Sequence, residues 1–181
     1  IEAGTYMVGA AISGGEVLVE NVIPTHLHPI VAKLQETGAY VEETDHGILV
    51  RASQGIFPAD IKTLPYPGFP TDMQSQMMAL LSLGRGSSMI VENVFENRFQ
   101  IVDELKRMGA NIKVEGHTAV VEGVNTLYGA RVKATDLRAG AALVLAGLAA
   151  RGDTLIENAI HIFRGYEDLI PKLTGLGARV E

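Results

Sequence analysis

The sequence contains no cysteine. This absence excludes a disulfide scaffold, a thiol nucleophile and a zinc site with cysteine ligands within the chain. Basic residues are also in the minority, because 15 lysines and arginines stand against 21 aspartates and glutamates, giving a net charge of -6. Nonspecific nucleic-acid binding requires a basic face, so we expect no nucleic-acid partner.

Long hydrophobic runs are missing as well. The longest run of apolar residues and glycine, Ala139 to Ala150, is too short to span a bilayer, so we expect no membrane partner. No signal peptide is visible, and a start at Ile1 rather than methionine suggests a processed or excised piece. The chain has 181 residues, of which 47% are apolar, enough for one domain with a substantial core.

The most informative feature of the sequence is an internal repeat that occurs three times. Each copy has a Glu-Asn dipeptide after a short apolar run, at Glu20, Glu92 and Glu157. Each has a long apolar stretch before it that opens at a threonine, at Thr5, Thr71 and Thr135. Because the copies recur about every 65 residues, we divide one domain into repeat units 1–62, 63–128 and 129–181.

Each unit predicts the same elements. Threonine caps an apolar helix, a strand follows, and an amphipathic helix ends at a Gly-Ala pair before two more strands. The predicted elements of the second unit are a helix from Met73 to Leu83, a strand Ser88–Glu92, a helix Arg98–Met108, and strands Asn111–Val114 and Thr118–Val121. The first unit predicts a helix from about Tyr6 to Ser13, a strand Glu16–Glu20 and a helix around Ile30–Leu34. The third predicts a helix capped by Thr135 and running to about Ala150, a strand Thr154–Glu157, and a helix lined by Leu169, Ile170, Leu173 and Leu176.

The two kinds of helix predict the architecture. A helix that is apolar on all sides must be surrounded by protein, whereas an amphipathic helix covers a surface. We therefore expect an α+β domain with pseudo-threefold symmetry and three helices inside. The third unit stops at Glu181 before its closing hairpin strand, so we expect a segment outside this chain to pair there.

Differences between the copies point to chemistry. Asp72 and Asp136 each follow the threonine, which compensation of the helix dipole would also explain, but the first unit has Tyr6 there. Arg138 lies in a first helical turn, where a cation opposes the dipole. Such a locally broken rule marks a functional site, unless Arg138 simply forms an ion pair with Asp136.

Two arginines occupy matched loops between strand and second helix, namely Arg98 and Arg164. The simpler interpretation is solvated surface arginine, but the guanidinium fork suits carboxylate and phosphate groups. We therefore predict that Arg98, Arg138 and Arg164 converge with Asp72 on one anion site. His26 and His28 could supply two metal ligands, but no matching partner is evident, and we expect no metal.

Four segments carry a family resemblance: Phe69-Pro70-Thr71-Asp72-Met73-Gln74, Phe95-Glu96-Asn97-Arg98-Phe99, Ala134-Thr135-Asp136-Leu137-Arg138-Ala139, and His161-Ile162-Phe163-Arg164-Gly165-Tyr166-Glu167. In this order they resemble the UDP-N-acetylglucosamine 1-carboxyvinyltransferases, which are enolpyruvyl transferases. The resemblance covers the whole chain but only about half of such an enzyme, its C-terminal portion. It implies an inside-out α/β barrel of three repeated units with buried helices, in agreement with the expectation from the repeats.

The resemblance also implies an activity. The family transfers enolpyruvate from phosphoenolpyruvate to the 3-hydroxyl of UDP-N-acetylglucosamine, the first committed step of peptidoglycan synthesis, in the cytoplasm. Cell wall biogenesis, cell shape and cell division depend on that product. No cofactor is implied. The resemblance assigns the following roles: Asp72 as the carboxylate that takes the hydroxyl proton, Thr71, Val94 and Phe95 as sugar-nucleotide contacts, Arg98, Arg138 and Arg164 as the cluster facing phosphoenolpyruvate, and Asp136 as a residue that orients this cluster.

Part of the expected site belongs to a missing N-terminal domain, which in this family carries a cysteine-bearing loop and further phosphoenolpyruvate ligands. We therefore expect the isolated chain to be inactive. Two alternatives remain open. One is a domain of the sister enzyme, 5-enolpyruvylshikimate-3-phosphate synthase, and the other is a non-catalytic repeat module that binds a sugar nucleotide or a protein.

Overall fold

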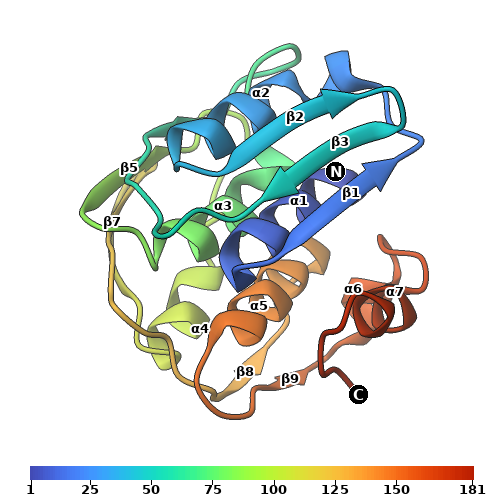
Figure 1. Cartoon of the computed structure of the whole chain (residues 1–181). Coiled ribbons are helices and arrows are strands. Elements are labelled where there is room, and N and C mark those ends of the chain that lie inside the picture. Colours follow the sequence, from blue (N-terminus) through green and yellow to red (C-terminus); the bar gives the residue numbers. More distant parts are fainter.

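Three apolar helices pack against one another in the middle of the molecule (Figure 1). They are α1 (Glu2–Ser13), α3 (Gln74–Leu81) and α5 (Leu137–Ala149). Every residue of α3 is buried, as are most of α1 and α5. The structure is a computed structural model that describes residues 1–181. The prediction of central buried helices is therefore confirmed.

Three small sheets lie around these helices. The first has the order β1 (Glu16–Glu20), β3 (Gly47–Arg51), β2 (Tyr40–Thr44), with both pairs antiparallel. The second has the order β4 (Ile61–Lys62), β5 (Ser87–Val91), β7 (Thr118–Glu122), β6 (Asn111–Glu115), in which only β4 and β5 are parallel. The third is a parallel pair, β8 (Arg131–Lys133) and β9 (Leu155–Glu157).

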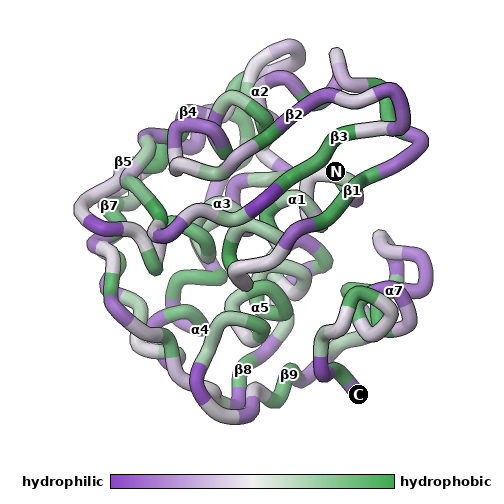
Figure 2. The backbone as a smooth tube through the Cα atoms, in the orientation of Figure 1, coloured by the Kyte–Doolittle hydropathy of each residue, from purple (hydrophilic) through white to green (hydrophobic).

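The remaining helices cover the outside: α2 (Pro24–Glu36), α4 (Ile101–Arg107), α6 (Ile160–Phe163) and α7 (Leu169–Gly175). In α2 and α4 the buried residues lie on one face, as the amphipathic pattern predicts. Figure 2 shows hydrophobic colouring along the central helix α5 and in the middle of β3, the central strand of its sheet. No helix combines the length and the apolarity needed to cross a bilayer.

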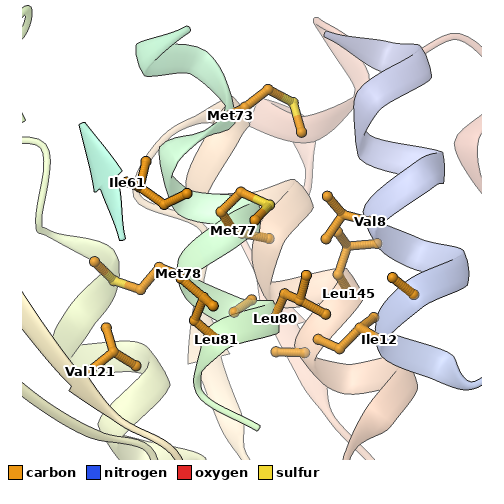
Figure 3. Close-up of a cluster of buried hydrophobic side chains, with 14 of the residues drawn as sticks. Val8, Ile12, Ile61, Met73, Met77, Met78, Leu80, Leu81, Val121 and Leu145 are labelled. Carbon is orange, nitrogen blue, oxygen red and sulfur yellow. The ribbon is translucent and has the colours of Figure 1, made fainter. Parts of the chain in front are cut away.

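The core is one cluster of 37 buried residues. Figure 3 shows its centre, where Met77 and Leu80 of α3 face Val8 of α1 and Leu145 of α5. A smaller cluster of six residues joins α5 to α6 and α7 and includes Tyr166 and Ile162. Full burial of each large apolar side chain contributes about 1.5–3 kcal/mol, so the helical centre is the main source of stability.

The predicted threonine caps are wrong in all three units, although α3 begins within one residue of the predicted Met73. In the first unit, α1 begins at Glu2, and the Thr5 hydroxyl donates to the carbonyl of Ile1 inside the helix. Thr71 opens a 3₁₀ turn, η1 (Thr71–Met73), but its hydroxyl makes no cap. In the third unit Asp136, not Thr135, is the N-cap, and its Oδ1 accepts from the backbone N–H groups of Arg138 and Ala139 at 2.8 and 2.9 Å.

Other boundaries differ by a few residues. β5 and β9 begin within one residue of prediction, whereas α2 is longer than the predicted Ile30–Leu34 and α4 begins three residues after Arg98. The short helix α6 was not predicted. The α+β class is confirmed. The strands form three sheets around the central helices, as the inside-out arrangement with buried helices predicts. The repeat boundaries and the pairing of an outside segment stay predictions.

Candidate functional site

A carboxylate held by two arginines lies where the central helices begin. Nη2 of Arg98 donates to Oδ1 of Asp72 at 2.7 Å, and Nη2 of Arg138 donates to Oδ2 at 3.1 Å. Asp72 lies in η1, Arg98 in the loop between β5 and α4, and Arg138 in the first turn of α5. The arginine side chains are only 14% and 17% exposed, while that of Asp72 is 38% exposed. The guanidinium groups thus lie behind a carboxylate that solvent reaches.

Opposing influences set the pKa of Asp72. Burial raises the pKa, but the hydrogen bond from Arg98 and the charges of Arg138 and Arg98 outweigh it, so the pKa lies below its ordinary value. Asp72 is therefore ionised at neutral pH. The arrangement neutralises part of the arginine charge, and it leaves further guanidinium donors for an added anion.

A buried polar network supports Arg138. Its guanidinium lies 5.8 Å from the ring centre of Tyr166. The Tyr166 hydroxyl lies 3.0 Å from Oγ1 of Thr5, and Nε2 of Gln76 donates to both oxygens at 3.1 and 3.3 Å. Thr5 and Gln76 belong to α1 and α3, so the network joins one residue from each third of the chain, all at most 2% exposed.

The network gives a testable stability effect. Tyr166→Phe removes the hydroxyl that meets Thr5 and Gln76, and we expect the free energy of unfolding to fall by about 1 kcal/mol. Tyr128→Phe is the matched control, because the Tyr128 side chain is exposed, and it should change stability by less than about 0.5 kcal/mol. Thermal or urea denaturation of the purified variants measures both. Equal effects would mean that the network contributes nothing.

Arg98 is supported from another direction. Its Nη1 donates to the Thr71 hydroxyl at 2.8 Å, and its guanidinium lies 4.9 Å from the ring centre of Phe95. Val94 and Phe95 are 44% and 58% exposed, and their backbone N–H groups donate to the carboxylate of Glu92. These two residues therefore present apolar surface beside the charged groups.

The structure separates the predicted site residues into two sets. It brings Asp72, Arg98 and Arg138 together, with Thr71 between them. Arg164 is exposed at the end of α6 and makes no hydrogen bond or ion pair with Asp72, although the ring of Tyr166, two residues further on, lies against the Arg138 guanidinium. The alternative ion pair of Arg138 with Asp136 is wrong, because the Arg138 side chain pairs with Asp72 and Asp136 binds only backbone.

Sequence reasoning missed Glu92, Tyr166, Thr5 and Gln76 as members of the site. Tyr166 lies in one of the four segments that carry the family resemblance, and Glu92 belongs to the repeated Glu-Asn pair. Both residues were therefore noticed in the sequence, but neither differed in charge from what its position predicts. At Tyr6, the position equivalent to Asp72, burial together with the nearby Glu2 and Tyr166 raises the pKa to about 12, so this position supplies no charge. His28 meets Glu43 at 3.4 Å on the surface, and no cluster of three metal-binding side chains forms.

Comparison with known proteins identifies the family. Residues 1–173 match the family model of EPSP synthase (3-phosphoshikimate 1-carboxyvinyltransferase). The chain belongs to the EPSP synthase family. The fold of this family member is also that of the enolpyruvyl transferase NikO from Streptomyces tendae, with a TM-score of 0.86, 26% identity, and coverage of 99% of this chain and 43% of that one.

Within the EPSP synthase family, curated relatives with high sequence identity to this chain share one enzyme name. A UDP-N-acetylglucosamine 1-carboxyvinyltransferase from Desulfofundulus thermocisternus is 65% identical over 99% of this chain and 74% of its own length. A second, UDP-N-acetylglucosamine 1-carboxyvinyltransferase 2 from Carboxydothermus hydrogenoformans, is 60% identical over 100% of this chain. The chain spans 44% of that relative. An EPSP synthase from Acinetobacter baumannii is 22% identical with a TM-score of 0.75, which shows the shared fold.

Proposed function

We propose that this chain forms the C-terminal half of a UDP-N-acetylglucosamine 1-carboxyvinyltransferase. The observation that carries the proposal is the Asp72 carboxylate held between Arg98 and Arg138 at the solvent-facing start of the central helices. A base and two anion-binding groups are among the parts that transfer of enolpyruvate to a hydroxyl requires. The 60–65% identity to enzymes of that name supports the choice of substrate.

In this proposal Asp72 removes the proton from the 3-hydroxyl of UDP-N-acetylglucosamine. The freed oxygen bonds to C2 of phosphoenolpyruvate while C3 gains a proton. C3 of the tetrahedral adduct then gives up a proton and phosphate leaves from C2 as the double bond re-forms, so that the hydroxyl proton taken by Asp72 is the net proton released. Arg98 and Arg138 hold the anionic groups of phosphoenolpyruvate and of the adduct. Thr71, Val94 and Phe95 contact the sugar nucleotide, and the exposed Arg164 reaches the anion when the cleft closes, while Asp136 fixes the first turn that carries Arg138.

The lowered pKa of Asp72 makes it a weak base while both arginines hold it. Phosphoenolpyruvate carries a carboxylate and a phosphate, so its arrival would compete for the same guanidinium groups. Weaker contacts from the arginines raise the pKa of Asp72 and make it a better base. The arrangement thus couples the reactivity of Asp72 to the presence of the donor substrate.

The other half of the site lies, in this proposal, on an N-terminal domain of the same enzyme. The chain spans 44% of the relative from Carboxydothermus hydrogenoformans, which leaves room for such a domain. The complete enzyme acts in the cytoplasm, needs no cofactor, and supplies peptidoglycan synthesis, on which cell wall biogenesis, cell shape and cell division depend.

Acceptor choice tests this function against its alternatives. We expect isothermal titration of the full-length enzyme to show saturable binding of UDP-N-acetylglucosamine and none of shikimate 3-phosphate. The reverse preference would make the protein an EPSP synthase, which the family model alone leaves open. Binding of the sugar nucleotide without any phosphate release when phosphoenolpyruvate is added would favour the non-catalytic module.

A further inference from the structure

Glu92 is a buried acidic residue with no cationic partner. It directly follows β5 and is 1% exposed. Burial of a carboxylate is costly unless hydrogen bonds compensate for the lost water. Four donors do so: Oε1 accepts from the Thr63 hydroxyl at 2.7 Å and from the Val94 and Phe95 N–H groups at 2.9 and 3.0 Å, and Oε2 accepts from the Thr71 hydroxyl at 2.9 Å.

The three-fold repeat shows that the fold itself does not require this arrangement. Glu20, at the equivalent position in the first unit, is exposed at the end of β1. Glu157, in the third unit, forms an exposed ion pair with Arg131 on the neighbouring strand. Of the three glutamates, only Glu92 is buried and hydrogen-bonded to residues of the candidate site. This environment is therefore specific to the second unit.

The hydrogen bonds have a fixed direction. The Thr71 hydroxyl has one proton, which it gives to Oε2 of Glu92, so its oxygen is free to accept from Nη1 of Arg98 at 2.8 Å. The other terminal nitrogen of Arg98 donates to Asp72 at 2.7 Å. A continuous path therefore runs from Glu92 through Thr71 and Arg98 to the Asp72 carboxylate.

We propose that Glu92 is a positioning residue that, through the Thr71 hydroxyl, fixes the guanidinium of Arg98 against Asp72. Glu92 itself is too deeply buried to touch a substrate. Its role for the rate rests on the proposed function, whereas its role in placing Arg98 does not. A displaced reacting group of the order of 1 Å costs roughly 10²-fold in rate, so a residue that fixes this geometry has a measurable effect.

Glu92→Gln tests the proposal because it keeps the shape of the side chain. Three donors hold the amide oxygen at the Oε1 position, so the amide nitrogen faces Thr71. The Thr71 oxygen then meets two donors, and its own proton loses its acceptor, which loosens Arg98. The loosened guanidinium no longer holds the anion in place, and this loss outweighs the gain in basicity of Asp72. In the full-length enzyme we expect kcat to fall about 10–100-fold, with the KM for UDP-N-acetylglucosamine changed less than about threefold.

The pKa of Asp72, followed by carbon NMR of labelled aspartate without substrate, gives a second readout. The charged groups acting on Asp72 are Arg98 and Arg138. Loosening Arg98 raises the pKa of Asp72 in Glu92→Gln. If Glu92 acted only as a nearby negative charge, its removal would lower that pKa instead. An unchanged or lowered pKa overturns the proposal, as does an unchanged kcat in a folded variant.

Two further variants keep the test decisive. Thr71→Val breaks the same link and serves if Glu92→Gln does not fold. Thr71→Ser keeps the hydroxyl, so the pKa of Asp72 in this variant should equal the wild-type value. Glu20→Gln is the matched control at the equivalent repeat position and should change neither kcat nor the pKa. Because the NMR readout needs no substrate, failure of the wild-type enzyme to use UDP-N-acetylglucosamine would contradict the proposed function and leave the positioning role tested separately.

Discussion

Asp72→Asn in the full-length enzyme should lower kcat by roughly 10²–10⁴-fold. Asparagine keeps the size and one acceptor oxygen, but it cannot take the proton of the acceptor hydroxyl. The loss of stability should stay within about 1 kcal/mol, because the Asp72 side chain is partly exposed and its ion pairs with Arg98 and Arg138 are reached by solvent. Steady-state phosphate release and thermal denaturation measure the two effects.

A matched control separates charge loss from proton transfer. Asp45 lies exposed in the turn between β2 and β3, so Asp45→Asn removes one negative charge far from the arginines and should leave kcat unchanged. A well-folded Asp72→Asn enzyme with a near-normal rate would reduce Asp72 to a structural partner of the two arginines.

The isolated chain should fold but show no turnover. Its 37-residue core joins all three central helices, so it has the apolar contacts of an independent domain. The candidate site, in contrast, is reached by solvent, and the proposed function assigns the residues that enclose phosphoenolpyruvate to another domain. We expect a cooperative thermal transition and no phosphate release above background when both substrates are added.

The full-length enzyme is the control for that measurement, at the same concentration and with the same substrates. Release by the isolated chain at roughly 1 s⁻¹ or faster, a typical enzyme rate, would show that one half of the cleft suffices. An isolated chain without a cooperative transition would instead show that the repeats need the missing domain to fold.

The sequence predicted the central helices because their burial follows from composition alone. A helix such as α5, which has only apolar residues and glycine after Arg138, can be stable only inside protein. Strands β6 and β7 were also predicted closely, because alternation and the turn at Gly116 act locally. The positions of helix starts depended on a choice between adjacent capping residues, and Asp136 prevailed over Thr135.

The sequence predicted the candidate site at residues that are unfavourable for their local structure. Arg138 opposes the helix dipole, and the structure shows the compensating carboxylate of Asp72, 66 residues away in sequence. Glu92 broke no local rule, since glutamate recurs at that position in every unit. Its burial results from the packing of Thr63 and Thr71 around it, which no single-segment pattern contains.

Arg164 shows the opposite case. The repeat placed it at a position matching Arg98, but the third unit has the extra helix α6 there, which leaves Arg164 exposed at its end. A matched sequence position therefore predicted the segment correctly and not the side-chain contact. Its part in anion binding stays a prediction for the closed enzyme.

The central claim is that the group of Asp72, Arg98 and Arg138 serves enolpyruvyl transfer to a sugar nucleotide. The most direct test mixes the full-length enzyme with phosphoenolpyruvate and either UDP-N-acetylglucosamine or shikimate 3-phosphate, and follows phosphate release and product mass. We predict release only with UDP-N-acetylglucosamine, accompanied by a product heavier by one enolpyruvyl group. Release only with shikimate 3-phosphate, or with neither acceptor, would contradict the account.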